Sequence, residues 1–68
     1  MKFGAYLRKA RERQGMNQAA LADKSGIPQT TISGIENDGK IPNFNNASKL
    51  ADALGIDMND FPKERVSK

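Results

Sequence analysis

The stretch QAALADKSGIPQTTISGIEN, residues 18–37, contains the pattern that decides the fold. Two short helical segments, residues 18–25 and about 28–37, are separated by Gly26, which tolerates the positive φ that a tight turn requires. Ala22 supplies a small side chain where two steeply crossing helices touch. Apolar anchors for a core follow at helical spacing: Leu21, Ile27, Ile32 and Ile35. Any one of these features is common, but their joint spacing predicts a helix-turn-helix motif.

The sequence on either side of this motif also predicts helices, and no apolar pattern indicates a strand. Apolar spacing typical of helices covers three further ranges: residues 2–14, 44–54 and 58–61. Residues suited to N-caps precede three of the helices: Asn17, Asn43 and Asp57. Gly15 and Gly55 follow two of them. We therefore expect an all-α fold, a compact bundle of five short helices in one domain over residues 1–61, followed by a flexible tail over 62–68.

Length and composition exclude several classes of protein. A chain of 68 residues forms a single domain, and this one has neither Cys nor His. Zinc fingers, disulfide scaffolds, Cys or Ser–His nucleophiles and imidazole bases are therefore excluded. No apolar run approaches the ~20 residues of a membrane span, and the N-terminal segment has no signal-peptide core. We therefore expect a cytoplasmic protein. Because no acidic pair has the spacing of a catalytic site, we also expect a non-enzymatic module, without metal or cofactor.

Basic residues gather near the N-terminus. The net charge is +3, and most of the excess lies between residues 1 and 15. The basic residues there, opposed only by Glu12, are Lys2, Arg8, Lys9, Arg11 and Arg13. A local basic cluster attracts a polyanion even when the total charge is modest, although such a cluster is also typical of a solvated helix face.

The helix expected over residues 28–37 has two different faces. At about 100° per residue, Thr31, Ile32 and Ile35 share the side that we expect to be buried. The opposite side has short amides and hydroxyls and no charge, whereas a merely solvated helix usually carries Lys and Glu there. Its members are Thr30, Ser33, Gly34 and Asn37, with Gln29 on the flank. Such groups suit DNA bases, because Gln can pair with adenine and the Thr methyl can contact that of thymine.

Taken together, these segments resemble the helix-turn-helix family of the lambda Cro and CI repressors, the XRE-like regulators. The resemblance runs from about Phe3 to Phe61 and includes MNQAALADKSGI, TISGIENDGKIPNF and SKLADALGI. In that family five helices pack together, and the third enters the major groove. The resemblance implies a lambda repressor-like domain that binds double-stranded DNA sequence-specifically and regulates transcription. We expect a repressor that blocks polymerase; the alternative is an activator that contacts it.

Geometry and the resemblance together assign roles to individual residues. The expected base contacts are Gln29, Thr30, Ser33, Gly34 and Asn37. The phosphate contacts that the resemblance implies are Gln18, Arg11, Lys40 and Asn43, of which Asn43 is also an expected N-cap. In the family, the pair corresponding to Arg11 and Glu36 forms an ion bridge that positions the arginine beside the phosphates. The alternative is two unrelated surface charges.

Three residues depart from the family pattern: Ser25, Pro28 and Gly34. Gly34 stands where relatives often carry a long polar side chain that reaches a base. Either the backbone approaches DNA closely there, or the helix reads fewer bases and depends on DNA shape. Pro28 presets the start of the helix but offers no side-chain acceptor to cap it.

One small helix pair gives limited specificity, since each mismatched base pair costs only ~1–3 kcal/mol. We therefore expect a homodimer on a palindromic site, with half-sites about one helical turn apart. Its interface is expected around Ile56, Met58 and Phe61, unless these side chains close the core of the monomer. The alternative function is a protein-interaction module of the same fold, such as an anti-repressor or an antitoxin component.

Overall fold

The computed structural model describes residues 2–62, so most of the expected C-terminal tail lies outside the described residues. The elements follow in the order α1 (Phe3–Arg13), α2 (Gln18–Ser25), α3 (Gln29–Asp38), α4 (Phe44–Leu54) and η1 (Met58–Asp60). The prediction of an all-α fold is confirmed. The last of the five expected helices is only a 3₁₀ turn of three residues. Within residues 2–62, no helix has the length and apolar character needed to cross a bilayer.

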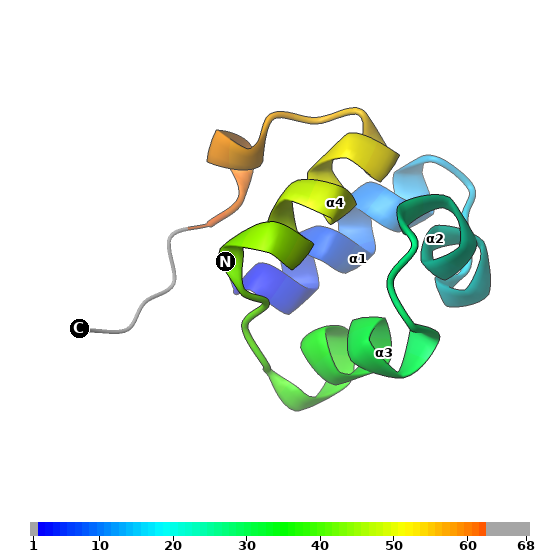
Figure 1. Cartoon of the computed structure of the whole chain (residues 1–68), viewed down its shortest axis with the longest axis horizontal. Helices are drawn as coiled ribbons and strands as arrows, with labels where there is room; N and C mark the ends of the chain where they lie inside the picture. Colours follow the sequence, from blue (N-terminus) through cyan, green and yellow to red (C-terminus); the bar gives the residue numbers. More distant parts are fainter. Residues whose placement is uncertain (1, 63–68) are drawn as a thin grey trace.

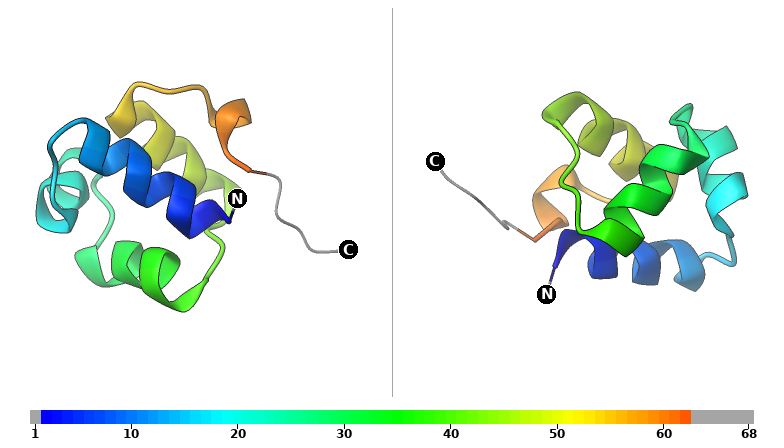
Figure 2. Two further views of the ribbon diagram at one scale, coloured as in Figure 1. Left: turned by 180° about the vertical axis from the view of Figure 1, so that it is seen from behind. Right: turned by 90° about the horizontal axis from the view of Figure 1, so that it is seen from below.

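The helices enclose a common core, with α3 at one edge of the molecule (Figure 1). α3 packs against both α1 and α2, and α2 also packs against α4. The segment of residues 39–43 leads from the end of α3 to α4, and η1 packs on α4. Seen from behind, α1 lies in front (Figure 2, left). α3 is thus held from one side by α1 and α2, and its other side faces outward.

Apolar side chains from all four α-helices form the core. The fully buried ones are Leu7, Leu21, Ile32, Ile35 and Leu50. Phe61 is also buried and stacks on Phe3, with the ring centroids 4.4 Å apart. Of the two alternatives for Phe61, a place in a dimer surface or in the core of the monomer, the structure shows the second, because its ring closes the core of its own chain. Ile56 and Met58 are half-buried against the same core.

The three expected N-caps are present. The side-chain oxygen of Asn17 accepts a hydrogen bond from the N–H of Ala20 at 2.7 Å. Asn43 caps α4 in the same way, and Asp57 caps η1. Because such bonds satisfy N–H groups that a helix leaves unpaired, they fix where each helix begins.

The turn between α2 and α3 has the conformation that the sequence indicates. Gly26 ends α2 in the left-handed region with φ 77°, which a residue with a Cβ adopts at a cost. Pro28 lies outside the helix as an extended N-cap without a side-chain bond, so α3 begins at Gln29, one residue later than expected.

Gly4 sets how closely α1 and α3 approach. It is buried within the first turn of α1. A Cβ at this position would collide with the backbone carbonyl oxygen of Ile35 in α3. The absence of a side chain therefore allows the two helix backbones to touch.

Candidate nucleic-acid interface

The inner side of α3 is fixed to α1 by a buried ion pair. Arg11 donates from Nε to Oε2 of Glu36 and from Nη2 to Oε1, both at 2.9 Å. The two side chains are only 9% and 0% exposed. Nη1 of Arg11 donates to the carbonyl of Met16 at 2.8 Å, which also ties in the loop before α2. The pair is thus a buried bidentate contact between two helices, as the family resemblance implies, and not two unrelated surface charges.

The electrostatics of this pair favour a permanently charged arginine. The hydrogen bonds that Arg11 donates to the carboxylate of Glu36 raise the pKa of Arg11 above its ordinary value, against the opposing effect of burial. Arg11 therefore stays cationic throughout the neutral pH range. Three of its five N–H groups are engaged inside the protein. Its position is primarily structural, and its contact with a phosphate stays a prediction.

Gln18 joins the same pair from the start of α2. Its Nε2 donates to Oε1 of Glu36 at 3.1 Å. Glu36 thus connects α1, α2 and α3, and we call Arg11, Gln18 and Glu36 the Glu36 cluster. The sequence analysis assigned Gln18 to a phosphate and missed this bond, because no local pattern relates residues 18 positions apart. The amide of Gln18 keeps one further N–H for another acceptor.

The outer side of α3 has the polar character expected from the sequence. Gln29, Thr30 and Asn37 are exposed, and Ser33 is half-buried. Nδ2 of Asn37 donates to Oγ of Ser33 at 3.0 Å, which links two of the expected base-contacting residues. On the inner side Ile32 and Ile35 are fully buried, as Leu21 of α2 is, whereas Ala22 is half-buried. The helix therefore has a buried apolar side and an open, uncharged polar side.

Gly34 does not lie open on that outer side. It is buried, so the expectation of an exposed position is wrong. The physical reason is Lys40, whose Cδ lies 3.3 Å from the place that a Cβ of residue 34 would occupy. Neither of the two alternatives for Gly34 considered from the sequence included a covering side chain.

A groove between α3 and the segment of residues 39–43 brings two sets of predicted residues together. Thr30 and Thr31 line it from α3, and Lys40 and Asn43 line it from the segment that follows. The side-chain oxygen of Asn43 is engaged as the cap of α4, which leaves its NH₂ group as a donor. Gly34 lines it as well, so two expected base contacts, Thr30 and Gly34, and two expected phosphate contacts share one groove.

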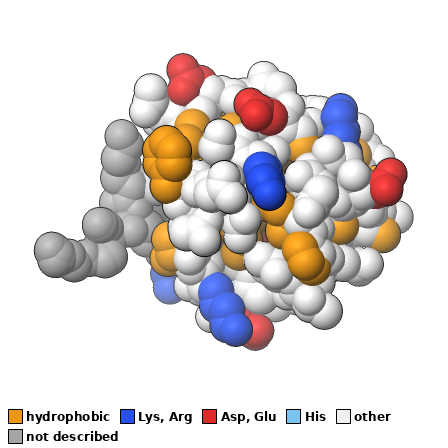
Figure 3. All heavy atoms as spheres, in the orientation of Figure 1, with side chains coloured by type: hydrophobic (Ala, Val, Ile, Leu, Met, Phe, Trp, Pro, Cys, Tyr) orange, Lys and Arg blue, Asp and Glu red, His pale blue; other side chains and the backbone are white. Residues whose placement is uncertain are grey.

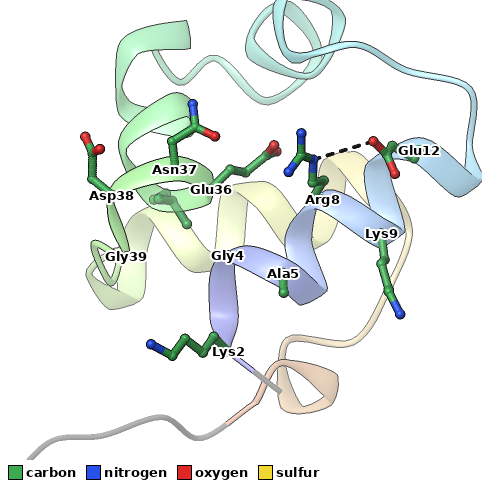
Figure 4. A pocket seen from close by; sticks show the side chains of 11 residues that line it. Lys2, Gly4, Ala5, Arg8, Lys9, Glu12, Glu36, Asn37, Asp38 and Gly39 are labelled. Atoms are coloured by element: carbon green, nitrogen blue, oxygen red, sulfur yellow. Dashed lines mark ion pairs between the residues drawn. The ribbon is translucent and has the colours of Figure 1, made fainter.

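The charged side chains of α1 do not gather at one groove. Arg8 pairs with Glu12 at 3.6 Å, and both side chains are more than half exposed. Figure 4 shows this pair beside the groove between α1 and the end of α3, with Lys2 and Lys9 pointing in different directions. On the face drawn in Figure 3, Lys and Arg side chains also stand singly. In the part of the chain that is described, no three His, Cys, Asp or Glu residues group as metal ligands.

Comparisons with known proteins agree with this architecture. The chain matches the helix-turn-helix family over residues 7–61. The helix-turn-helix transcriptional regulator PuuR of Escherichia coli (strain K12), and likewise that of Shigella flexneri, is 33% identical over 61 residues, which cover 90% of this chain. The chain spans only about a third (33%) of the length of these curated relatives.

A solved structure extends the comparison to the fold. The restriction-modification controller protein C.AhdI from Aeromonas hydrophila matches with a TM-score of 0.79 and 35% identity. The match covers 84% of this chain and 86% of that one. The spacing of the motif, the packing of α2 and α3 and these matches lead to one conclusion: the chain belongs to the helix-turn-helix family, of the XRE-like type.

Proposed function

We propose that this chain binds double-stranded DNA sequence-specifically and regulates transcription, with α3 lying in the major groove. The observation that carries the proposal is the outer side of α3. It offers amide and hydroxyl groups without charge, on a helix that is fixed from behind by a buried core and by the Glu36 cluster. Such groups match the donor and acceptor pattern of base edges in the major groove.

The proposed base contacts are Gln29, Thr30, Ser33 and Asn37. Gln29 and Thr30 stand at the start of α3, the part of a recognition helix that commonly approaches base edges. The bond between Asn37 and Ser33 restricts both side chains before DNA arrives, so less conformational entropy is lost on binding. The hydroxyl of Ser33 and the second N–H of Asn37 then remain as donors.

The proposed backbone contacts flank this helix. Gln18 stands at the start of α2, where unpaired N–H groups and the helix dipole favour a phosphate. Lys40 and Asn43 lie on the segment that leads away from α3. Arg11 keeps two N–H groups beyond those used in the Glu36 cluster, but it is the least exposed of the four. These contacts would set the register of α3 without reading sequence.

We further propose that two copies act together on a palindromic operator. Two half-sites, about one helical turn apart, supply the specificity that one short helix lacks. A dimer bound over a promoter represses transcription by excluding polymerase. The regulatory names of PuuR and C.AhdI support a role in control of gene expression. Since Phe61 is buried, it takes no part in the proposed contact between copies.

Selection of bound sequences from random duplexes, followed by affinity measurements at several salt concentrations, tests the proposal. We expect a site with two-fold symmetry and an affinity that falls steeply as salt rises. Gln29→Ala should relax the preference at one base pair, whereas Gln18→Ala should weaken binding to all sequences alike. Binding without any preference, even at low ionic strength, would contradict sequence-specific recognition. The same pattern of loss from both variants would contradict the division of roles.

One observation favours a second candidate function, a protein-interaction module. Phe44, the first residue of α4, is 77% exposed, and Ile41, three residues before it in the chain, is 50% exposed. Exposed apolar side chains that stand close together are typical of protein contacts. The selection experiment separates the two candidates, because a module of this kind would show no preferred duplex.

A further inference from the structure

Gly34 lies at an unusual place on α3. Thr30 and Asn37, on the same side of the helix, are exposed, but Gly34 is buried. Beyond the two neighbouring residues and the backbone of α3 itself, the atoms that a Cβ at this position would meet within 4 Å belong to one side chain: Cδ of Lys40 at 3.3 Å and Cε at 3.9 Å. The methylene chain of Lys40 therefore lies against Gly34, and it would have to move by a few tenths of an ångström if position 34 carried a Cβ.

Backbone hydrogen bonds to Gly34 also fix the position of Lys40. The carbonyl of Gly34 accepts hydrogen bonds from the N–H of Gly39, which has φ 75°, and from the N–H of Lys40 at 3.3 Å. The left-handed residue turns the chain back over the last turn of α3. Lys40 is thus anchored to Gly34 through its backbone and lies on it through its side chain.

The charges of α3 make this arrangement significant. Its ten residues, QTTISGIEND, include no Lys or Arg. Of its two acidic residues, Glu36 is buried in the Glu36 cluster and Asp38 ends the helix. Lys40 consequently brings a cation to an outer side that has none of its own. It also lines the groove shared with Thr30, Thr31 and Asn43.

We propose that Gly34 is a positioning residue for Lys40, and that the ammonium group of Lys40 replaces, as a DNA contact, the side chain that position 34 lacks. Its partner would be an acceptor atom of the duplex, either a phosphate oxygen or the edge of a guanine. This inference rests on the proposed function. A free lysine loses rotamer freedom when it binds, whereas one already laid along a helix loses less.

NMR of the free protein tests the position of Lys40 without any DNA. We expect nuclear Overhauser contacts between the Hα protons of Gly34 and the δ and ε methylenes of Lys40. Their absence would overturn the inference whether or not the chain binds DNA. If they are present but the wild-type chain binds no duplex, the proposed function fails and the DNA role of Lys40 fails with it, while the packing on Gly34 stands.

A double-mutant cycle tests the DNA contact. Lys40→Met keeps an unbranched stem but removes the charge; we expect affinity to fall about tenfold near 0.1 M salt and the salt slope to decrease by about 1. Gly34→Ala should displace the stem and lower affinity about threefold. It should leave Tm unchanged or raise it, since Ala is the better helix former. In the Lys40→Met background, Gly34→Ala should have no effect on affinity.

The matched control is Lys49→Met, which removes an exposed lysine from α4 and should leave affinity unchanged. Equal loss from Gly34→Ala in both backgrounds would overturn the inference, because position 34 would then act independently of Lys40. So would a loss of Tm that parallels the loss of affinity. A loss from Lys40→Met that is uniform across sequences identifies a phosphate as the partner, and a loss at one base pair identifies a guanine edge.

Discussion

The two sides of α3 differ in burial, charge and hydrogen bonding. The inner side holds Glu36, whose buried carboxylate is bonded to Arg11 and Gln18 in the Glu36 cluster. The outer side is uncharged, open to solvent and has one side-chain hydrogen bond, from Asn37 to Ser33. Within residues 2–62, no buried side-chain nitrogen or oxygen lacks a hydrogen-bond partner. The difference indicates that the inner side fixes the helix so that the outer side is free to bind.

This division has a physical basis. A buried charge is stable only when it is paired and hydrogen-bonded, so the inner side tolerates little change. Exposed polar side chains exchange protein contacts for water at little cost, so the outer side tolerates change in the free protein. Substitutions on the inner side should therefore alter stability, and those on the outer side should alter recognition.

The largest effect is expected from Glu36→Ala. It leaves the buried guanidinium of Arg11 without its partner and removes the acceptor of Gln18. The free energy of unfolding should fall by about 3–5 kcal/mol, measured by urea denaturation. Glu12→Ala is the control, since it breaks the exposed pair with Arg8, leaves the Arg11–Glu36 pair in place and should change stability by less than about 1 kcal/mol. Similar losses from the two variants would contradict the contrast between the two sides.

An intermediate effect is expected from Gly4→Ala, where α1 and α3 touch. Helix propensity alone would stabilise the variant by up to about 1 kcal/mol. The collision of the added methyl group with the carbonyl of Ile35 should instead destabilise it by about 1–3 kcal/mol. The sign of the change in Tm decides between the two. Ala5→Ser, at the exposed neighbouring position, provides a reference for an ordinary substitution in α1.

The smallest effect on stability is expected from Ser33→Ala, on the outer side. It removes the acceptor of Asn37, and the free energy of unfolding should change by no more than about 0.5 kcal/mol. Affinity for the selected duplex should nevertheless fall roughly fivefold or more, with relaxed preference near one base pair. Ser48→Ala, at a half-buried position of α4, should leave affinity unchanged. A stability loss without a change in preference would place Ser33 outside the DNA interface.

Local signals in the sequence located most of the fold. Asn17, Asn43 and Asp57 cap the elements that they were expected to cap, because a cap acts on N–H groups only two or three residues away. Apolar spacing identified the buried positions Ile32 and Ile35, because helical periodicity also relates residues only three or four positions apart. The candidate site was harder to predict, because Gly34 was expected on the exposed side but is buried, and the sequence left open whether Phe61 faces a partner or the core.

The sequence by itself determined the helices, their ends and the two faces of α3, because caps and periodicity operate within a few residues. Only the tertiary structure decided that Glu36 holds both Arg11 and Gln18, from 25 and 18 residues away. It also decided that Gly4 marks a helix crossing and that Lys40 covers Gly34. Such contacts depend on how folded helices pack against one another. The sequence around a glycine or a charged residue does not show which distant residue will contact it.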